Sequence, residues 1–264
     1  MSTAADEFAI ARALFNAFEQ GTSVEPPTIS NPGLDVAAAY AIQRQVTALH
    51  RDAGRTVVGR KIGLTSEAIQ RQLGVDSPDY GVILDSHVFT NGAVLGRSRG
   101  RMVAPRIEAE LAVVLHSELS GPGLTTVEVL GALRAIVPVF ELIDSRVADW
   151  RIALEDTIAD NASCYGVVRG SEVDPADARD LRSVTVSISR DGDEVAAGRG
   201  EAVLGHPGAA VAWLGNELSR FGQSLPAGEL ILSGSFTAAV DALPGAYCAK
   251  FSEPIPPVRA TIES

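Results

Sequence analysis

Three glutamates interrupt segments that are otherwise apolar, and this pattern restricts how the chain can fold. Glu108 and Glu110 lie in the run Ile-Glu-Ala-Glu-Leu-Ala-Val-Val-Leu that begins at Ile107. Glu141 lies in Val-Pro-Val-Phe-Glu-Leu-Ile, which begins at Val137. Runs of this length and apolarity predict buried β-strands. Because alternate residues of a strand point to the same face, we expect Glu108 and Glu110 on one face and their apolar neighbours on the other.

Burial of these carboxylates requires compensation. Neighbouring carboxylates repel each other, and an unpaired buried charge costs roughly several kcal/mol. A bound divalent cation removes both costs, and an all-oxygen ligand set favours Mg²⁺ or Mn²⁺ over zinc. The alternative is a half-exposed antiparallel strand whose Glu-x-Glu pair faces water. Glu141 favours the metal site, because its neighbours indicate an interior segment and no lysine lies near it in sequence.

The composition excludes several classes of function. The 264-residue chain has a formal charge of −11 and a pI near 4.8, whereas nucleic-acid binding requires clustered Lys and Arg, so we expect no nucleic-acid partner. No stretch has the ~20 apolar residues of a membrane span, and the acidic N-terminus lacks a secretory pattern. We therefore expect no membrane association and a cytoplasmic location. The two cysteines show no metal-binding spacing and are expected to be reduced.

Hydrophobic periodicity divides the chain into an N-terminal helical region, residues 1–55, and a strand-rich core, residues 56–264. Two amphipathic helices are predicted in the first region, separated by a proline-containing loop, and Asp35 is a suitable N-cap for the second. In the core we expect strands at 56–62, 102–115 and 137–144, a hairpin that turns at Asp191-Gly192, and helices at 127–136 and after His206. Since strands and helices do not alternate regularly, the expected class is α+β.

Lys61 and Asp79 are candidates for acid–base chemistry in combination with the glutamates. Lys61 lies between Gly59 and Gly63 at the end of an expected strand, and a partly desolvated lysine can transfer protons near neutral pH. Taken alone, the segment is also typical of a surface lysine. Asp79 is either a turn residue or a catalytic partner. The polar segment 156–163 can hold a carboxylate or water, or can simply form a loop.

Seven short motifs occur together in one order along the chain. They are Gly59-Arg-Lys-Ile-Gly-Leu-Thr-Ser66, Gln72-Leu-Gly-Val-Asp-Ser-Pro-Asp-Tyr-Gly81, Pro105-Arg-Ile-Glu-Ala-Glu-Leu111, Glu141-Leu-Ile-Asp-Ser-Arg146, Asp149-Trp150, Asp156-Thr-Ile-Ala-Asp-Asn-Ala-Ser163 and Leu232-Ser-Gly-Ser235. Each motif is weak alone, but the set is specific. It resembles the hydratase/decarboxylase branch of the fumarylacetoacetase superfamily, and the resemblance extends from about residue 35 to residue 262.

The resemblance implies a fold, a cofactor and an assembly. The expected fold is a mixed β-roll or sandwich core with peripheral helices, and Glu108, Glu110 and Glu141 fall on the family's positions for the ligands of a Mg²⁺ or Mn²⁺ ion. The resemblance also implies a homo-oligomer, and association with a pathway aldolase or decarboxylase is possible in this family.

The same resemblance implies roles in the substrate pocket. Lys61 and Asp79 fall on positions with acid–base roles, and Ser163 lies in the family's substrate-pocket motif. We predict further substrate contacts from Arg60 and Asn161.

The implied activity is addition of water to 2-hydroxypenta-2,4-dienoate to give 4-hydroxy-2-oxopentanoate, in meta-cleavage catabolism of aromatic or related ring compounds. One alternative is decarboxylation of 2-oxo-3-hexenedioate (4-oxalocrotonate), whose second carboxylate would need a cation from Arg60, Arg106 or Arg146. Acylpyruvate hydrolysis would need a Glu–His dyad, and a non-catalytic partner subunit is the remaining alternative.

Overall fold

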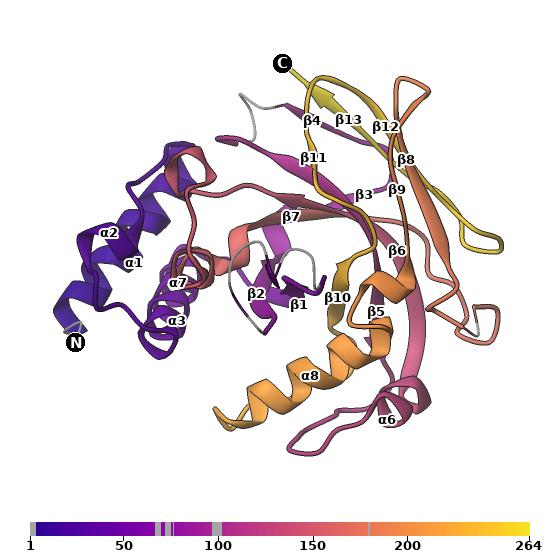
Figure 1. Cartoon of the computed structure of the whole chain (residues 1–264), viewed down its shortest axis with the longest axis horizontal. Helices are drawn as coiled ribbons and strands as arrows, with labels where there is room; N and C mark the ends of the chain where they lie inside the picture. Colours follow the sequence, from indigo (N-terminus) through magenta and orange to yellow (C-terminus); the bar gives the residue numbers. More distant parts are fainter. Residues whose placement is uncertain (1–3, 67–69, 72–74, 76, 97–101, 179) are drawn as a thin grey trace.

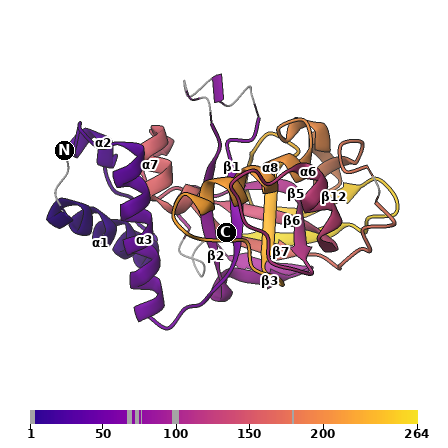
Figure 2. The ribbon, with the colours of Figure 1, turned by 90° about the horizontal axis from the view of Figure 1, so that it is seen from below.

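Four helices lie together on one side of the molecule. A computed structural model describes residues 4–66, 70–71, 75, 77–96, 102–178 and 180–264. Figures 1 and 2 place helices α1 (Ala4–Gln20), α2 (Pro27–Ser30), α3 (Val36–Asp52) and α7 (Leu154–Ala159) beside the sheets. As predicted, Asp35 caps α3, and its carboxylate accepts a hydrogen bond from the Ala38 amide at 2.8 Å. Gln43 of α3 donates to the carbonyl oxygens of Tyr80 and Ile158, at 2.8 and 2.9 Å, and these buried bonds tie the helices to the core.

The larger sheet curls into a roll. Its main path runs in the order β2-β1-β10-β5-β6-β7-β3, and β11 pairs with β5. The strands are β1 (Val57–Gly63), β2 (Asp79–Leu84), β3 (Val88–Thr90), β5 (Arg106–Leu115), β6 (Leu133–Ile143), β7 (Cys164–Arg169), β10 (Leu230–Ser235) and β11 (Val240–Asp241). Strands β2 and β3 lie at opposite ends of this path, yet only the 3₁₀ turn Asp85–His87 separates them in the chain. The two ends of the sheet must therefore approach each other, which closes the roll.

A second sheet and two further helices complete the core. The sheet has the order β4-β13-β12-β8-β9, with β4 (Ala93–Gly96), β8 (Thr185–Arg190), β9 (Asp193–Arg199), β12 (Gly245–Phe251) and β13 (Val258–Glu263). Asp191 and Gly192 turn the predicted hairpin between β8 and β9, both with positive φ. Helix α8 (Pro207–Ser219) packs against β10 and β1, and α6 (Thr126–Gly131) packs against α8. This arrangement confirms the α+β class with a rolled mixed core.

Alternation along the strands separates two apolar clusters. On β5, Ile107, Leu111 and Val113 belong to the main core, which extends to the helices and the second sheet. Ala112 and Val114 belong to a smaller cluster inside the roll. The members of that cluster are Ile83, Ala112, Val114, Ala135, Val137, Val139, Cys164, Val167, Leu230 and Leu232. We call the face that bears this cluster the inner face.

The structure shifts two of the predicted element boundaries. The helix predicted at 127–136 ends at Gly131, and the remaining residues start β6 at Leu133, because pairing with β5 outweighs the helical pattern. The strand expected from residue 102 begins at Arg106. Both cysteines are free, as predicted. The division between residues 55 and 56 stays a prediction.

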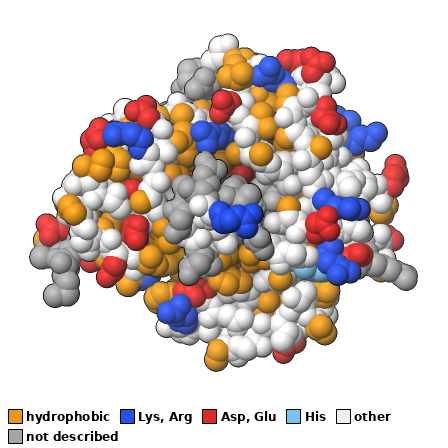
Figure 3. Space-filling model, in the orientation of Figure 1, with side chains coloured by type: hydrophobic (Ala, Val, Ile, Leu, Met, Phe, Trp, Pro, Cys, Tyr) orange, Lys and Arg blue, Asp and Glu red, His pale blue; other side chains and the backbone are white. Residues whose placement is uncertain are grey.

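Charged side chains of both signs are present on the face of the molecule that Figure 3 shows. Among the described side chains visible in Figure 3, acidic and basic groups are interspersed, and neither sign forms a continuous band. Among the described residues, no helix combines the length and apolarity needed to cross a membrane.

Candidate active site and metal centre

Strand pairing brings the three glutamates together on the inner face. Glu108 of β5 lies directly opposite Glu141 of β6 in the antiparallel register, and Glu110 follows two residues along β5. Their exposed fractions are only 8% for Glu108, 1% for Glu110 and 0% for Glu141. One carboxylate oxygen from each lies within 4.8 Å of the others, which is close enough for all three to ligate one ion.

The hydrogen bonding of these carboxylates fits a cation. Glu110 Oε2 accepts from the Gly234 amide at 2.9 Å, but its Oε1 and both carboxylate oxygens of Glu141 have no hydrogen-bond partner. Without a cation, burial raises the pKa of Glu108, Glu110 and Glu141, and the negative charge of Glu141 raises it further at the other two. An all-oxygen site of this kind suits Mg²⁺ or Mn²⁺.

Lys61, predicted as an acid–base residue, lies beside the glutamates. Its Nζ is 3.4 Å from Glu141 Oε1 and donates to the Ala162 carbonyl at 3.0 Å. Burial lowers the pKa of Lys61, but the charges of Glu141 and Asp79 outweigh burial, so the net shift is upward. One ammonium group cannot balance three buried glutamates and Asp79, which strengthens the case for a divalent ion.

Asp79 stands at the start of β2, next to β1. Burial raises its pKa, against an opposing effect of Lys61. Oδ2 accepts a hydrogen bond from Thr157 Oγ1 at 3.2 Å, whereas Oδ1 has no partner. Gly63 allows this arrangement, because a Cβ at that position would lie 2.2 Å from Asp79 Oδ1.

Lys61, Asp79 and Glu108 line a cavity of about 410 Å³. This volume lies within the range of roughly 300–1,000 Å³ that is usual for small-molecule sites. The lining residues are Lys61, Gly63, Leu64, Asp79, Arg106, Glu108, Ile143, Asp149, Trp150, Ile152, Thr157, Ala162, Ser163 and Ala239. A second cavity, of about 430 Å³ between Phe18, His87 and Tyr165, is lined by none of Glu108, Glu110 and Glu141.

Backbone strain marks the same cavity independently of the charges. Eight non-glycine residues among those described have positive φ, and five of these line the cavity. The five are Leu64, Asp149, Trp150, Ala162 and Ser163. Left-handed conformations of such residues cost free energy and concentrate at functional sites.

Comparison with known proteins identifies the family. The model of the fumarylacetoacetate (FAA) hydrolase C-terminal family matches residues 57–258. The chain belongs to the fumarylacetoacetate hydrolase family. The matched region begins at β1 and includes all the candidate site residues.

Relatives of known activity cover most of the chain. A 2-hydroxyhexa-2,4-dienoate hydratase of Comamonas testosteroni is 41% identical over 233 residues, 88% of each chain. A 2-keto-4-pentenoate hydratase of Paraburkholderia xenovorans strain LB400 is 43% identical over 235 residues, 89% of this chain and 87% of the relative. A solved structure, 4-oxalocrotonate decarboxylase from Pseudomonas putida G7 complexed with magnesium and adipate, superimposes with a TM-score of 0.95 at 33% identity and covers 99% of both chains.

The structure of this family member brings most of the predicted site residues together. Lys61, Asp79, Glu108 and Ser163 line the cavity, and Glu110 lies behind Glu108 on the same face of β5. Glu141 reaches the group from β6. Their roles stay proposals.

Two predicted substrate contacts are not placed at the cavity. Arg60 precedes Lys61 on β1, so its side chain leaves the opposite face of the strand, where it pairs with Glu229. Asn161 accepts from the Val82 amide at 2.8 Å and donates to the Val82 carbonyl at 2.9 Å, so its side chain joins β2 to the segment before β7. Neither residue is among those lining the cavity.

Thr157 and Trp150 were absent from the predicted site, and Arg106 was predicted only as a cation for the decarboxylase alternative. Thr157 bonds to Asp79, and Arg106 and Trp150 stand at the cavity wall with the guanidinium 4.3 Å from the indole centroid. The small polar residues of 156–163 indicated Thr157 only as part of a cluster. No local pattern indicated that Arg106 and Trp150 meet, because they lie far apart in the chain.

Proposed function

We propose that this protein is a Mg²⁺- or Mn²⁺-dependent hydratase that converts 2-hydroxypenta-2,4-dienoate to 4-hydroxy-2-oxopentanoate. The observation that carries the proposal is the three-glutamate centre beside a cavity that Glu108 and the buried Lys61 and Asp79 line. Similarity to two hydratases that act on dienoate or ketopentenoate substrates supports the reaction class. An acidic protein repels an anionic substrate at long range, so a local cation is needed to receive it.

A bound divalent cation supplies positive charge that attracts the substrate's carboxylate and 2-oxygen and favours the enolate. Glu108, Glu110 and Glu141 would hold it. The protein's own groups then move protons: C5 is protonated as the dienol becomes an α,β-unsaturated ketone, water adds at C4, and C3 takes a proton. Lys61 and Asp79 are the buried titratable groups facing the cavity beside the glutamates, and we assign these transfers to them.

The wall of the cavity orients these two groups. The Ala162 carbonyl accepts from Lys61 Nζ, and Thr157 donates to Asp79, so each has a fixed neighbour. Ser163 Oγ lies 3.5 Å from Thr157 Oγ1 and faces the same cavity. We propose that Ser163 contacts the substrate.

The decisive experiment uses chelator-stripped protein and freshly prepared 2-hydroxypenta-2,4-dienoate, with and without Mg²⁺. Loss of the dienol absorbance is followed while the product is identified, because spontaneous ketonisation also removes that absorbance. Metal-dependent formation of 4-hydroxy-2-oxopentanoate supports the hydratase. Absence of this product with Mg²⁺ and with Mn²⁺ would overturn it.

Decarboxylation of 4-oxalocrotonate is the second candidate, and Arg106 is the observation that favours it. The Arg106 side chain is 36% exposed and stacks on Trp150 at the cavity wall, so it can receive a second substrate carboxylate. Arg106 pairs with the exposed Asp241 at 3.4 Å, whereas Arg60 and Arg146 pair with more buried carboxylates and do not line the cavity. The decarboxylase of similar structure contains adipate, a dicarboxylate. Release of CO₂ from 4-oxalocrotonate, without hydration of the dienoate, would assign the protein as a decarboxylase instead of a hydratase.

Acylpyruvate hydrolysis and a non-catalytic role have less support. All four histidines are described, and none lines the cavity, so a Glu–His dyad for the hydrolysis has no histidine there. A non-catalytic partner subunit would not need the complete set of charged groups.

We also propose a homo-oligomer, association with a pathway aldolase or decarboxylase, and a cytoplasmic location. Light scattering, co-purification and cell fractionation test these three points.

A further inference from the structure

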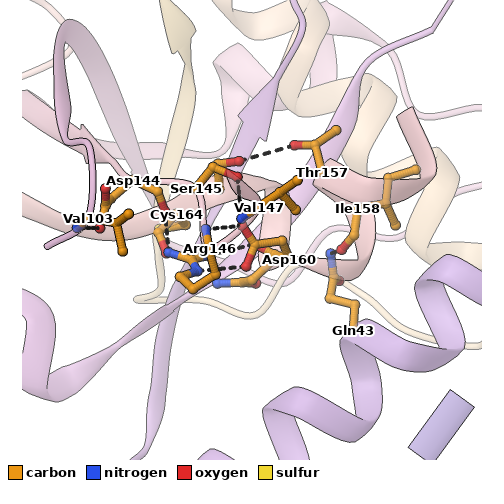
Figure 4. A network of polar contacts seen from close by, with 12 residues as sticks. Gln43, Val103, Asp144, Ser145, Arg146, Val147, Thr157, Ile158, Asp160 and Cys164 are labelled. Atoms are coloured by element: carbon orange, nitrogen blue, oxygen red, sulfur yellow. Dashed lines mark hydrogen bonds and ion pairs between the residues drawn. The ribbon is translucent and has the colours of Figure 1, made fainter. Parts of the chain in front are cut away.

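A buried arginine ties together the segment that leads into β7. Arg146, which is 3% exposed, donates through Nε to Asp160 Oδ1 at 2.6 Å and through Nη2 to the Asp160 carbonyl at 2.6 Å. Its backbone amide donates to Asp160 Oδ2 at 2.9 Å, and its Nη1 donates to the Asp144 carbonyl. Ser145 Oγ adds a bond to Asp160 Oδ2 at 3.2 Å. Figure 4 shows Arg146 and Asp160 at the centre of this network.

The segment that begins after Asp160 is strained throughout. Asn161, Ala162 and Ser163 have φ values of 56°, 51° and 53°, and none of them is glycine. Three successive left-handed residues persist only where their surroundings determine the conformation. The network around Asp160 lies at one end of the segment, and the pairing of Asn161 with Val82 holds its first residue.

The strained segment contacts Lys61 directly and reaches Asp79 through Thr157 of α7. The Ala162 carbonyl accepts the hydrogen bond of Lys61 Nζ at 3.0 Å. Ser163 Oγ lies 3.5 Å from Thr157 Oγ1, which donates to Asp79 Oδ2 at 3.2 Å. A change in the backbone at 161–163 therefore moves the neighbours of both Lys61 and Asp79.

We propose that Arg146 and Asp160 are positioning residues, which hold the strained segment Asn161–Ser163 so that it orients Lys61 and Asp79 for proton transfer. This inference rests on the proposed function. Neither residue lines the cavity, so their effect on turnover passes through the segment. A buried ion pair of this kind contributes little net stability compared with apolar packing. Stabilisation of the fold therefore does not explain why the pair lies beside the strained segment, whereas a positioning role does.

The test compares Asp160→Asn with Asn216→Ala. The first keeps the side-chain volume but removes the charge that Arg146 binds. The control residue Asn216 makes two hydrogen bonds to backbone, with the amide and carbonyl of Leu124 at 2.8 and 2.9 Å, and lies in α8 outside the cavity lining. Thermal stability, Mg²⁺ affinity by calorimetry with the metal alone, and kcat and KM are measured for both, well below their melting temperatures.

For Asp160→Asn we expect kcat to fall about 10–100-fold, with Mg²⁺ affinity and KM changed less than about threefold, as for other residues that orient a site without touching its ligand. Asn216→Ala is expected to lose stability with kcat within about twofold of wild type. An unchanged kcat in folded Asp160→Asn overturns the proposal, since it leaves the ion pair a structural role only.

A milder variant keeps the proposal testable if Asp160→Asn does not fold. Ser145→Ala removes one bond to Asp160, and we expect kcat to fall about two- to fivefold at constant Mg²⁺ affinity; no change in kcat counts against the proposal. Wild-type activity separates the two proposals. If wild type decarboxylates 4-oxalocrotonate and does not hydrate the dienoate, the proposed function has failed, and the variants are compared on the decarboxylation instead. Wild type inactive on both substrates overturns both proposals.

Discussion

The two ends of the inner face of the roll differ sharply, although the same strands build them. At one end Val114, Val137 and Leu230 pack against each other in an apolar cluster. Towards the start of β5 the same face carries Glu108 and Glu110 instead. Register, burial and strand direction are shared, so these features alone do not make a site.

What differs is the surroundings of the side chains. The apolar end is packed with other apolar side chains of the cluster. The acidic end adjoins a cavity of about 410 Å³ and receives Lys61 from β1 and Asp79 from β2. Packing alone can stabilise the first end, whereas the second needs opposite charge, from Lys61 and from a divalent ion. One end of this continuous face therefore stabilises the fold, and the other end carries the candidate site.

Among substitutions on the inner face, we expect Glu110→Gln at the acidic end to have the largest effect on turnover. The substitution removes a metal ligand and should cut turnover by about 10³-fold or more while weakening Mg²⁺ binding. Because it also removes one buried charge, the metal-free protein should be no less stable than wild type. Calorimetry with Mg²⁺ and thermal unfolding in chelator measure both effects. Unchanged Mg²⁺ affinity would remove Glu110 from the metal centre.

Lys61→Met should separate proton transfer from metal binding. We expect kcat to fall about 10²–10³-fold, the usual contribution of a positioned acid or base. Mg²⁺ affinity should change by less than about tenfold, because the three glutamates remain. Steady-state kinetics and Mg²⁺ titration provide the two measurements. Equal losses of turnover and metal affinity would assign Lys61 to the metal centre rather than to acid–base chemistry.

Leu230→Ala tests the apolar end. Deletion of this buried side chain should lower the free energy of unfolding by about 2–4 kcal/mol, through lost transfer free energy and a residual cavity. Turnover at a temperature where the variant is folded should stay within about twofold of wild type. Denaturant unfolding and kinetics at about 20 °C provide the comparison. A large loss of kcat in the folded variant would show that the two ends are mechanically coupled.

The smallest expected effect is a pH dependence that arises outside the inner face. Burial, with a smaller effect of Arg55, lowers the pKa of His87 to about 4 in the folded protein. Since the unfolded histidine titrates near 6.5, its contribution to stability is present above that pH and is lost as the pH falls towards 4. With Mg²⁺ saturating, we expect His87→Phe to reduce the loss of stability between pH 7 and pH 5 by about 1–2 kcal/mol. Chemical unfolding at the two pH values measures this; equal losses in both proteins would contradict it.

The carboxylates give the opposite sign when no metal is present. Burial raises the pKa of Glu108, so the metal-free protein gains stability as the pH falls through the range between that raised pKa and the value near 4.5 of the unfolded chain. Saturation with Mg²⁺ in the His87→Phe experiment prevents the titration of these carboxylates from contributing to the measured difference in stability.

Local patterns predicted several parts of the molecule correctly. The alternation around Glu108 and Glu110 placed both on one face, and the Asp191-Gly192 turn and the Asp35 cap occur where expected. The strand β13 was not predicted, although Val258, Ala260 and Ile262 alternate with more exposed residues and carried a usable signal. The same alternation already indicated that the neighbouring side chains of Arg60 and Lys61 face opposite sides of β1.

The sequence by itself determined the inner-face pattern of the glutamates, the preference for a hard cation and, through its motifs, the family. These properties depend on side-chain chemistry and on residues close together in the chain. Only the tertiary structure decided that Lys61 meets Glu141, that Arg106 stacks on Trp150, and that a strained segment contacts Lys61. Each of these contacts depends on how distant strands pair and on how the sheet closes. Long-range packing determines the pairing and the closure, and no local sequence pattern encodes that packing.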